Sequence, residues 1–265
     1  MSSAAEDNFQ KSMAMVNQAI AAVHPGISVQ EVLAAGEFEQ AVYMIWVASR
    51  LYFFDTYLPK RQEELMVQLL QLTPLFAEKK EGTFTRDEVI ALLKLLAAPI
   101  SRHLSGLRQG QTSTRGNLFE YIIKQPVADL FNGRTRSDGS KIAVARTPKK
   151  RQMENVDIAI SVGDVHVVGL SVKGNVRERL RESIQRAANA MNRGYFSHVW
   201  HCVLTSGDAA DRESPNTALS ESPYHGHRVY TWAPLCAATS EGFPRGAQLI
   251  PLSRLPGDIA AAVGL

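Results

Sequence analysis

The chain has only two cysteines among its 265 residues, Cys202 and Cys236. Two thiols cannot build the framework of several disulfides that stabilises small secreted domains. The first residues also lack a basic segment followed by an apolar core, which is the pattern of a secretory signal peptide. We therefore expect a protein of a reducing cytoplasm.

Motifs typical of several other protein classes are missing as well. The sequence contains no P-loop, no glycine-rich dinucleotide fingerprint and no internal repeat, so no nucleotide cofactor is expected. The segment 36–58 is rich in aromatic and aliphatic residues but is interrupted by Arg50 and Asp55, so it is more typical of a buried helix than of a membrane span. A zinc cluster of His198, His201 and Cys202 is disfavoured, because neighbouring strand positions point to opposite faces and no second ligand pair follows at finger spacing.

The charge of the chain is nearly balanced overall, at +3, but it is not evenly spread. Residues 134–193 contain thirteen Lys or Arg against six Asp or Glu. A local basic excess of this kind is typical of a surface that binds a phosphate backbone. We expect Lys149, Lys150 and Arg151 to contact DNA phosphates, with a nuclear localisation signal as the alternative interpretation of that run.

The most informative segment is 155–173, where two β-rich runs flank Gly163-Asp164 and predict a β-hairpin. Asp157 stands near the start of one arm, and Ser171 and Lys173 stand near the end of the other. Whether these side chains meet depends on the register, since opposed residues share a face and a slip of one residue reverses every side chain.

A three-residue turn, 163–165, would place Val162 opposite His166 and Asp157 opposite Ser171. A two-residue turn would instead place Asp157 opposite Leu170. We predict the three-residue turn or an equivalent bulge.

An Asp and a Lys on one face of a sheet can act together on a phosphodiester. Magnesium prefers oxygen ligands, often one or two carboxylates with phosphate and water, and a neighbouring Lys can orient water or steady the phosphate charge. Asp157 and Lys173 are therefore candidates for cutting a phosphodiester. The alternative is an ion pair on the surface of an ordinary hairpin.

The segment that follows Lys173 has helical periodicity over 175–193 and carries Arg177, Glu178 and Arg179 in its first turn. Arg donates two hydrogen bonds to guanine and Glu accepts from cytosine, so this triplet suits G·C base pairs in the major groove. The alternative is a charged helix face in solvent.

These residues together resemble a known family. An upstream helical Glu, Asp157, the tripeptide Ser171-Val-Lys173 and the Arg-Glu-Arg triplet look like the PD-(D/E)xK nucleases, and most of all like type II restriction endonucleases of the CCGG-recognising branch. The resemblance covers about 114–205. It implies that Asp157 is a metal ligand, that Lys173 is catalytic, and that Ser171 occupies the position of the usual carboxylate.

In that branch the missing acid comes from the next helix, about thirteen or fourteen residues after the Lys. This chain has Arg186 and Ala187 there, so Glu182, one helical turn earlier, is the candidate for the displaced acid. The resemblance also implies a further acid upstream, where Glu120 stands in an expected helix from 114 to 131. The alternative for Glu120 is an ordinary exposed helix residue.

The expected fold is α/β, with a mixed sheet flanked by helices and an N-terminal helical region. Residues 1–110 are expected to form a helical accessory or dimerisation region, with capping boxes at Ser28-x-x-Glu31 and Thr85-x-x-Glu88. Residues 111–265 are expected to form the nuclease core. The predicted elements of this core are a helix at 175–193, a long loop at 206–226 and strands near 141–147, 155–162, 166–173, 197–204 and 228–232.

The sequence therefore predicts a magnesium-dependent endonuclease of double-stranded DNA, a type II restriction enzyme that reads a palindrome containing CC and GG. A homodimer in a prokaryotic cytoplasm is expected, because two copies of the triplet would read the two halves of a palindrome. The alternatives are a structure-specific repair or recombination nuclease of the same fold and a DNA-binding protein that does not cleave.

Overall fold

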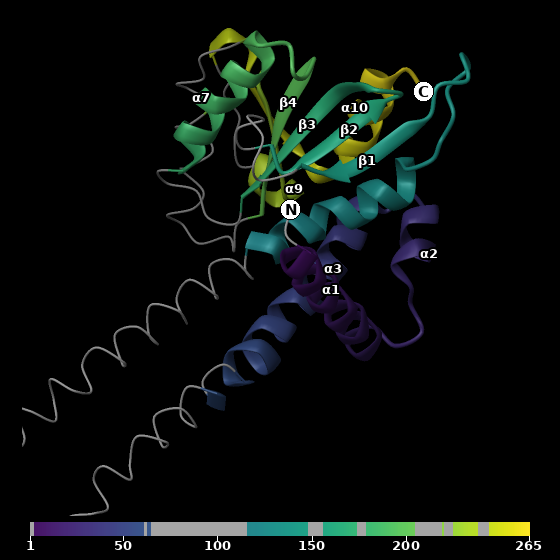
Figure 1. Cartoon of the computed structure of the whole chain (residues 1–265), viewed down its shortest axis with the longest axis vertical. Helices are drawn as coiled ribbons and strands as arrows, with labels where there is room; N and C mark the ends of the chain where they lie inside the picture. The colour runs from purple at the N-terminus through teal and green to yellow at the C-terminus, as the bar shows by residue number, and fades with distance from the viewer. Residues whose placement is uncertain are drawn as a thin grey trace, which may run out of the picture. The chain divides into compact units, whose positions relative to one another are not determined.

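The computed structural model describes residues 3–60, 63–64, 116–147, 156–173, 179–204, 219, 225–237 and 244–265 (Figure 1). The chain divides into two compact units, one formed by Met1–Ala48 with Gly116–Leu265 and the other by Ser49–Arg115. This division differs from the one expected from the sequence, in which residues 1–110 formed a separate region. The first 48 residues belong with the C-terminal half of the chain.

Long-range hydrogen bonds hold the first unit together. The Tyr121 hydroxyl donates a bond of 2.8 Å to the amide oxygen of Asn17, and the backbone N–H of Ala233 donates one of 2.7 Å to Glu39. Trp232 also meets Trp46 edge-on, with 5.9 Å between the ring centroids. N-terminal helices are therefore anchored to the segment 116–131, which precedes the first strand, and to residues 232–233, which lie between the last two strands.

The N-terminal helices of this unit are α1 (Ser3–Val23), α2 (Val29–Ala34) and α3 (Phe38–Leu51). The predicted capping box at the start of α2 is confirmed: the Glu31 N–H donates to the Ser28 hydroxyl at 3.1 Å, and the Ser28 N–H donates to the Glu31 carboxylate at 3.0 Å. Because α3 buries Phe38, Val42 and Ile45, it is a packed helix as expected. No helix in the described part of the chain has the length and hydrophobicity needed to cross a membrane.

The described residues of the second unit include a π-helical segment, η1 (Tyr52–Tyr57). Within it, Phe53 stacks on Tyr57 with 5.5 Å between ring centroids and meets Phe54 edge-on at 5.4 Å. The capping box expected at Thr85 lies outside the described residues.

A six-stranded mixed sheet forms the centre of the first unit, with the strands in the order of the sequence. The first three strands are antiparallel, and the third to sixth are parallel. The strands are β1 (Ile142–Arg146), β2 (Ile158–Val162), β3 (Val165–Lys173), β4 (His198–Val203), β5 (Arg228–Thr231) and β6 (Gln248–Pro251). The mixed sheet and the positions of the first five strands are confirmed, whereas β6 was not predicted.

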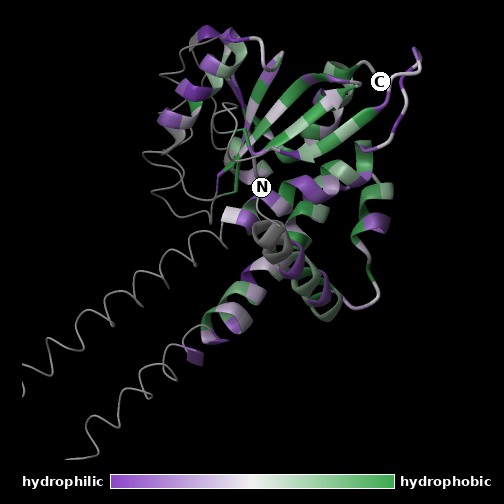
Figure 2. Ribbon diagram, in the orientation of Figure 1, coloured by the Kyte–Doolittle hydropathy of each residue, from purple (hydrophilic) through white to green (hydrophobic). Residues whose placement is uncertain are grey.

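Helices lie on both faces of this sheet. Helix α7 (Arg179–Asn192) forms the crossover from β3 to β4, as predicted, and its Ala187 and Ala190 pack with Ala159 and Val199 on one face. On the other face, α10 (Leu255–Val263) accepts a hydrogen bond of 2.8 Å at Asp258 from the Tyr230 hydroxyl. Figure 2 shows hydrophobic residues along the strands and hydrophilic residues on the outer turns of α7.

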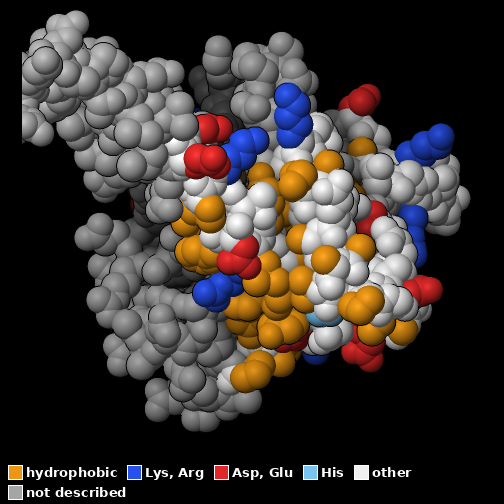
Figure 3. Space-filling model, turned by 90° about the horizontal axis from the view of Figure 1, so that it is seen from below, with side chains coloured by type: hydrophobic (Ala, Val, Ile, Leu, Met, Phe, Trp, Pro, Cys, Tyr) orange, Lys and Arg blue, Asp and Glu red, His pale blue; other side chains and the backbone are white. Residues whose placement is uncertain are grey.

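The remaining described elements connect or extend this core. A helical segment at 116–131 precedes β1 and continues through Pro126. Shorter helical elements are α9 (Ala233–Ala237), η2 (Pro244–Gly246) and η3 (Leu252–Arg254). Figure 3, seen from below, shows hydrophobic side chains gathered on one face of the described residues.

The hairpin of β2 and β3 has a two-residue turn, because Val162 pairs with Val165. The predicted three-residue turn is therefore wrong. Gly163 takes a positive φ of 55° at the first turn position, as a type II′ turn requires, and this tight turn matches the twist of the strands.

The equivalent bulge that we also predicted is confirmed. Ser161 pairs with His166 but Ile160 pairs with Val168, so Val167 is the extra residue on β3. Beyond this bulge Ile158 pairs with Leu170, and the next position along each strand brings Asp157 opposite Ser171. The bulge therefore brings Asp157 opposite Ser171, which is the same pairing that the predicted three-residue turn would have given.

Candidate active site

The backbone of Asp157 is fixed on both sides at the end of the sheet. Its N–H donates to the carbonyl of Leu170 at 2.8 Å, and its carbonyl accepts from the N–H of Thr147 at 3.1 Å. Asp157 is thus held between the strands on either side of it, and the direction of its side chain is set by the sheet.

Gly169 contributes to the same positioning. A Cβ atom at this residue would lie 2.9 Å from Cγ1 of Val156 and 3.2 Å from Cδ1 of Phe196, closer than such atoms normally approach. Only glycine therefore fits at this point of β3 without a shift of its neighbours. The close approach seats Val156 against the sheet, directly before Asp157.

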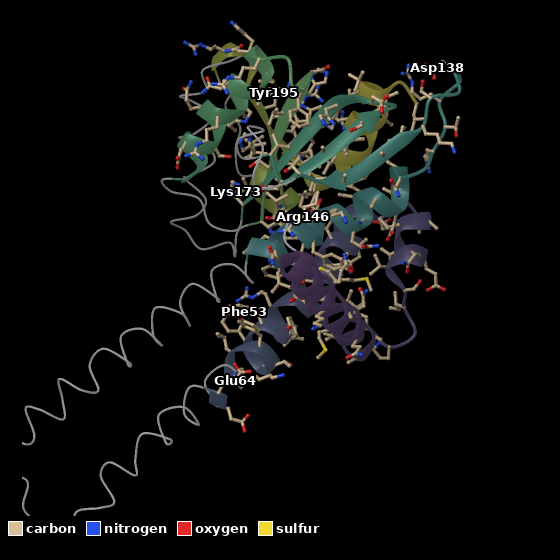
Figure 4. The ribbon with its side chains drawn as sticks, viewed as in Figure 1. Phe53, Glu64, Asp138, Arg146, Lys173 and Tyr195 are labelled. Carbon is tan, nitrogen blue, oxygen red and sulfur yellow. The ribbon has the colours of Figure 1, made fainter. Side chains whose placement is uncertain are left out.

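The carboxylate of Asp157 meets the end of β3 through one oxygen. Its Oδ2 accepts from the Val172 N–H at 2.7 Å, from Lys173 Nζ at 3.2 Å and from the Ser171 hydroxyl at 3.4 Å. The predicted meeting of Asp157, Ser171 and Lys173 is therefore confirmed, and Figure 4 shows Lys173 at this end of the sheet. The Asp157 and Lys173 side chains are each 19% exposed, so the pair is reachable from solvent but largely shielded from it.

A chain of buried polar groups continues inward from Ser171. The Ser171 and Ser183 hydroxyl oxygens lie 3.0 Å apart, and Ser183 Oγ lies 3.1 Å from Nε2 of His201. Nδ1 of His201 then lies 2.9 Å from Nε2 of His227. We call Ser171, Ser183, His201 and His227 the buried relay, since all four residues are buried.

The relay was not found from the sequence, because its members come from β3, α7, β4 and the residue directly before β5. One signal was available: β3 and β4 were both predicted, and in their parallel register Ser171 pairs with His201. His201 had been considered only as a zinc ligand.

Burial keeps both histidines of the relay neutral. It lowers the pKa of His201 well below its usual value, and repulsion from His227 and Lys173 acts in the same direction. Burial also lowers the pKa of His227, to about 3. A neutral imidazole carries one N–H and offers one acceptor nitrogen, so each ring can pass on a hydrogen bond in a definite direction.

The stability of the fold is therefore expected to fall in acid. Below about pH 6.5 the histidines of the unfolded chain bind protons that folded His201 and His227 do not, so the free energy of unfolding decreases as the pH is lowered. The His227 contribution is lost progressively down to its folded pKa of about 3. Urea unfolding between about pH 7.5 and pH 5.5 measures this loss. His227→Gln should lessen the decrease and His225→Gln, at an exposed position, should not; an equal decrease in His227→Gln would contradict the explanation.

The two candidate acids other than Asp157 are each paired with an arginine. Glu120, in the helical segment 116–131, forms a nearly buried ion pair with Nε of Arg146. Arg146 pairs with Ile158 across the sheet, one residue from Asp157, so strand alternation sends its side chain to the other face. Glu182 forms an exposed ion pair with Arg186, one helical turn away. Their assignment as metal ligands stays a prediction, and among the described residues no group of three His, Cys, Asp or Glu is placed to hold a metal ion.

The expected DNA-contacting residues fall mostly where the chain is not described. Arg177 and Glu178 lie outside the described residues, as do Lys149, Lys150 and Arg151. Arg179 is the first residue of α7, directly after them. Most of the loop expected at 206–226 is also outside the described part. Their roles stay predictions.

Comparisons with known proteins add no further assignment. No family model, no curated protein sequence and no solved structure matches this chain.

Proposed function

We propose that the chain is a magnesium-dependent endonuclease of double-stranded DNA, of the PD-(D/E)xK type. The observation that carries the proposal is the contact of Asp157 with Lys173 and Ser171 at one end of a mixed sheet, directly before the segment with the Arg-Glu-Arg triplet. An acid and a lysine 3.2 Å apart, each partly exposed, form a charged pair that a phosphodiester can reach. If this ion pair were purely structural, the excess of Lys and Arg in the surrounding residues 134–193 would have no explanation.

The Asp157 carboxylate is suited to hold a divalent cation. Within the described part of the chain, all of its hydrogen bonds use Oδ2, so Oδ1 is left to accept a ligand. Magnesium is commonly bound by one or two carboxylates, with water and substrate phosphate completing its shell. Bound there, it would supply Lewis-acid polarisation of the phosphate. Glu182 and Glu120 remain the candidates for a second acid.

Lys173 has two roles in this proposal. Its ammonium group, beside the carboxylate, donates a hydrogen bond to a phosphate oxygen and offsets the negative charge that grows there during attack. It also positions the attacking water by a second N–H. Since Lys173 is the last residue of β3 and Asp157 lies directly before β2, both are held by the sheet rather than by a loop. Ser171 takes the place of the usual carboxylate and orients Asp157.

The triplet Arg177, Glu178 and Arg179 is proposed to read bases beside the cut. It begins four residues after Lys173, so the bases that it reaches lie near the scissile phosphate. Two copies of the chain related by a twofold axis would read a palindrome containing CC and GG, and this is why we propose a homodimer.

A plasmid digestion tests this proposal. With magnesium, the purified chain is expected to cut plasmid DNA into discrete bands at sites containing CC and GG, and without magnesium it should not cut. Glu178→Ala should weaken binding to the specific site by about 10- to 100-fold, since a good base contact contributes roughly 1–3 kcal/mol, and should leave nonspecific binding nearly unchanged. A smear, or preferential cutting of branched DNA, would instead favour a structure-specific nuclease.

One observation favours a second candidate, a DNA-binding protein that does not cleave. Among the described residues, Asp157 is the acid that pairs with Lys173, whereas Glu120 and Glu182 form ion pairs with arginines. A site with too few acids would bind DNA without hydrolysing it. Binding in a filter or anisotropy assay, with no cutting under any divalent cation, would support this candidate.

A further inference from the structure

The buried relay links the candidate site to the interior of the protein through three successive hydrogen bonds of 3.0, 3.1 and 2.9 Å. Its outer end, Ser171, also lies 3.4 Å from the Asp157 carboxylate. Buried polar groups are costly unless they are satisfied, and a fully connected network of them is rigid. Three residues, Ser183, His201 and His227, are thus linked in series to the Ser171 hydroxyl that faces Asp157.

The hydrogen atoms of the relay can be arranged in two directions. In the outward direction, His227 donates from Nε2 to His201, His201 donates from Nε2 to Ser183, Ser183 donates to Ser171, and Ser171 donates to Asp157. In the inward direction every donor is reversed: Ser171 donates to Ser183 and His201 carries its proton on Nδ1. Because each hydroxyl and each neutral imidazole has one proton to donate, the relay changes direction as a unit.

The charge of Asp157 selects between these directions. Hydrogen bonds to an ionised acceptor are about twice as strong as those between neutral groups. An outward relay ends on the carboxylate, whereas an inward relay leaves the Ser171 oxygen lone pairs facing it. The outward direction is therefore the stable one while Asp157 is ionised, and it fixes the Ser171 hydroxyl as a donor.

We propose that Ser183, His201 and His227 are positioning residues, which hold the Ser171 hydroxyl as a hydrogen-bond donor to Asp157 and so keep Oδ1 of Asp157 turned toward the ligand side. The relay itself rests on the geometry alone, and its importance for cleavage rests on the proposed nuclease function. No member of the trio contacts the reacting atoms. Its effect reaches them through Ser171 and Asp157.

The relay is tested by the tautomers of the buried histidines in the full-length protein. Long-range ¹H–¹⁵N NMR distinguishes a proton on Nδ1 from one on Nε2, and His201→Gln and His227→Gln assign the signals. Both rings are expected to carry the proton on Nε2. Asp157→Ala, which removes the charged acceptor, should move His201 toward the Nδ1–H form. A histidine that only fills space would keep its tautomer, and an unchanged His201 spectrum would overturn the proposal.

Two further variants show whether the effect travels through the relay. Ser171→Ala cuts the chain, so adding Asp157→Ala to it should change the histidine tautomers no further. If the second substitution still changes them, the coupling takes another path and the proposal fails. Ser161→Ala is the matched control, because it removes a separate Ser–His hydrogen bond of 2.7 Å, to His166, in the same hairpin. Ser161→Ala should change the NMR signals of His166 and leave the tautomer of His201 unchanged.

Cleavage then tests the catalytic part. Ser183→Ala should lower kcat by roughly 10- to 100-fold, the usual cost of removing an outer support of a catalytic ligand, and change KM and DNA affinity by less than about twofold. Wild-type kcat in this variant would overturn the role in catalysis. If the wild-type protein cuts no DNA, the proposed function fails, whereas the tautomer measurement still decides whether the relay is coupled to Asp157.

Discussion

Asp157→Ala and Lys173→Ala are each expected to lower magnesium-dependent cleavage of DNA by roughly 100- to 10,000-fold, the range that a positioned catalytic group contributes. The first removes the carboxylate that holds the cation, and the second removes the ammonium group 3.2 Å from it. DNA binding should survive in both, because the proposed affinity comes mainly from phosphate contacts of other basic residues. Single-turnover cleavage and fluorescence anisotropy on the same oligonucleotide separate the two quantities.

Two controls show whether a loss of cleavage is specific to the pair of Asp157 and Lys173. Asp138 and Arg136 form another Asp–cation pair, 3.4 Å long and more exposed, so Asp138→Ala should cut at the wild-type rate. Asp157→Asn keeps an acceptor for the Val172 N–H, and circular dichroism shows whether the fold is retained. Near-wild-type cleavage by either Asp157→Ala or Lys173→Ala would remove the pair from the active site.

Arg146→Ala is expected to destabilise the protein by about 3 kcal/mol or more, because breaking a nearly buried ion pair leaves a carboxylate without its main cation. The Glu120 and Arg146 side chains are only about a tenth exposed, and Arg146 also donates from Nη2 to Asn117 at 2.5 Å. Chemical unfolding of the variant and the wild type measures the difference. Glu120→Ala should destabilise by a similar amount.

The chain offers a matched control in the pair of Glu182 and Arg186, which has the same chemistry on an exposed helix. Arg186→Ala should change stability by less than about 1 kcal/mol, as exposed pairs do. The double variant Glu120→Leu with Arg146→Met should recover much of the lost stability, since apolar replacement of a buried pair is often neutral. Cleavage by that folded double variant would show that Glu120 is structural, and loss of cleavage would support its role as an acid of the site.

The hairpin shows what local sequence can predict. Alternating β-branched residues and Gly163-Asp164 predicted both arms, and the requirement that Asp157 meet Lys173 led to the choice of an odd register. The sequence could not distinguish a three-residue turn from a bulge, because both place Asp157 opposite Ser171. The turn was decided by Gly163, whose positive φ permits the tight form.

Elements that depend on distant partners were harder to predict. The β6 strand has four residues, and none of them is fully buried, so it carries little alternation of its own. Helix α10 had readable signals, a proline in its first turn and Gly264 at its C-cap, but it is short and was not proposed. The buried relay could not be read from spacing, since its four members meet only when α7, β4 and β5 are packed together.

The grouping of residues 1–48 with the C-terminal half of the chain could not be predicted from local sequence either. Helical periodicity alone predicted one continuous helical region up to residue 110, because α1 and α3 do have apolar faces. Which surface covers those faces is a long-range property. It depends on contacts such as Tyr121 with Asn17, more than one hundred residues apart in sequence.

Val167 has a consequence for how the length of this hairpin can change during evolution. Deleting it would regularise the strand pairing and still leave Asp157 opposite Ser171, because Ser161 with His166 and Ile160 with Val168 would then be successive regular pairs. A regular pairing that kept Val167 would instead bring Ile160 opposite Val167 and Asp157 opposite Leu170. The bulge therefore compensates for a strand that is one residue too long, and a change of one residue between 163 and 168 preserves the site only where the turn or the bulge absorbs it.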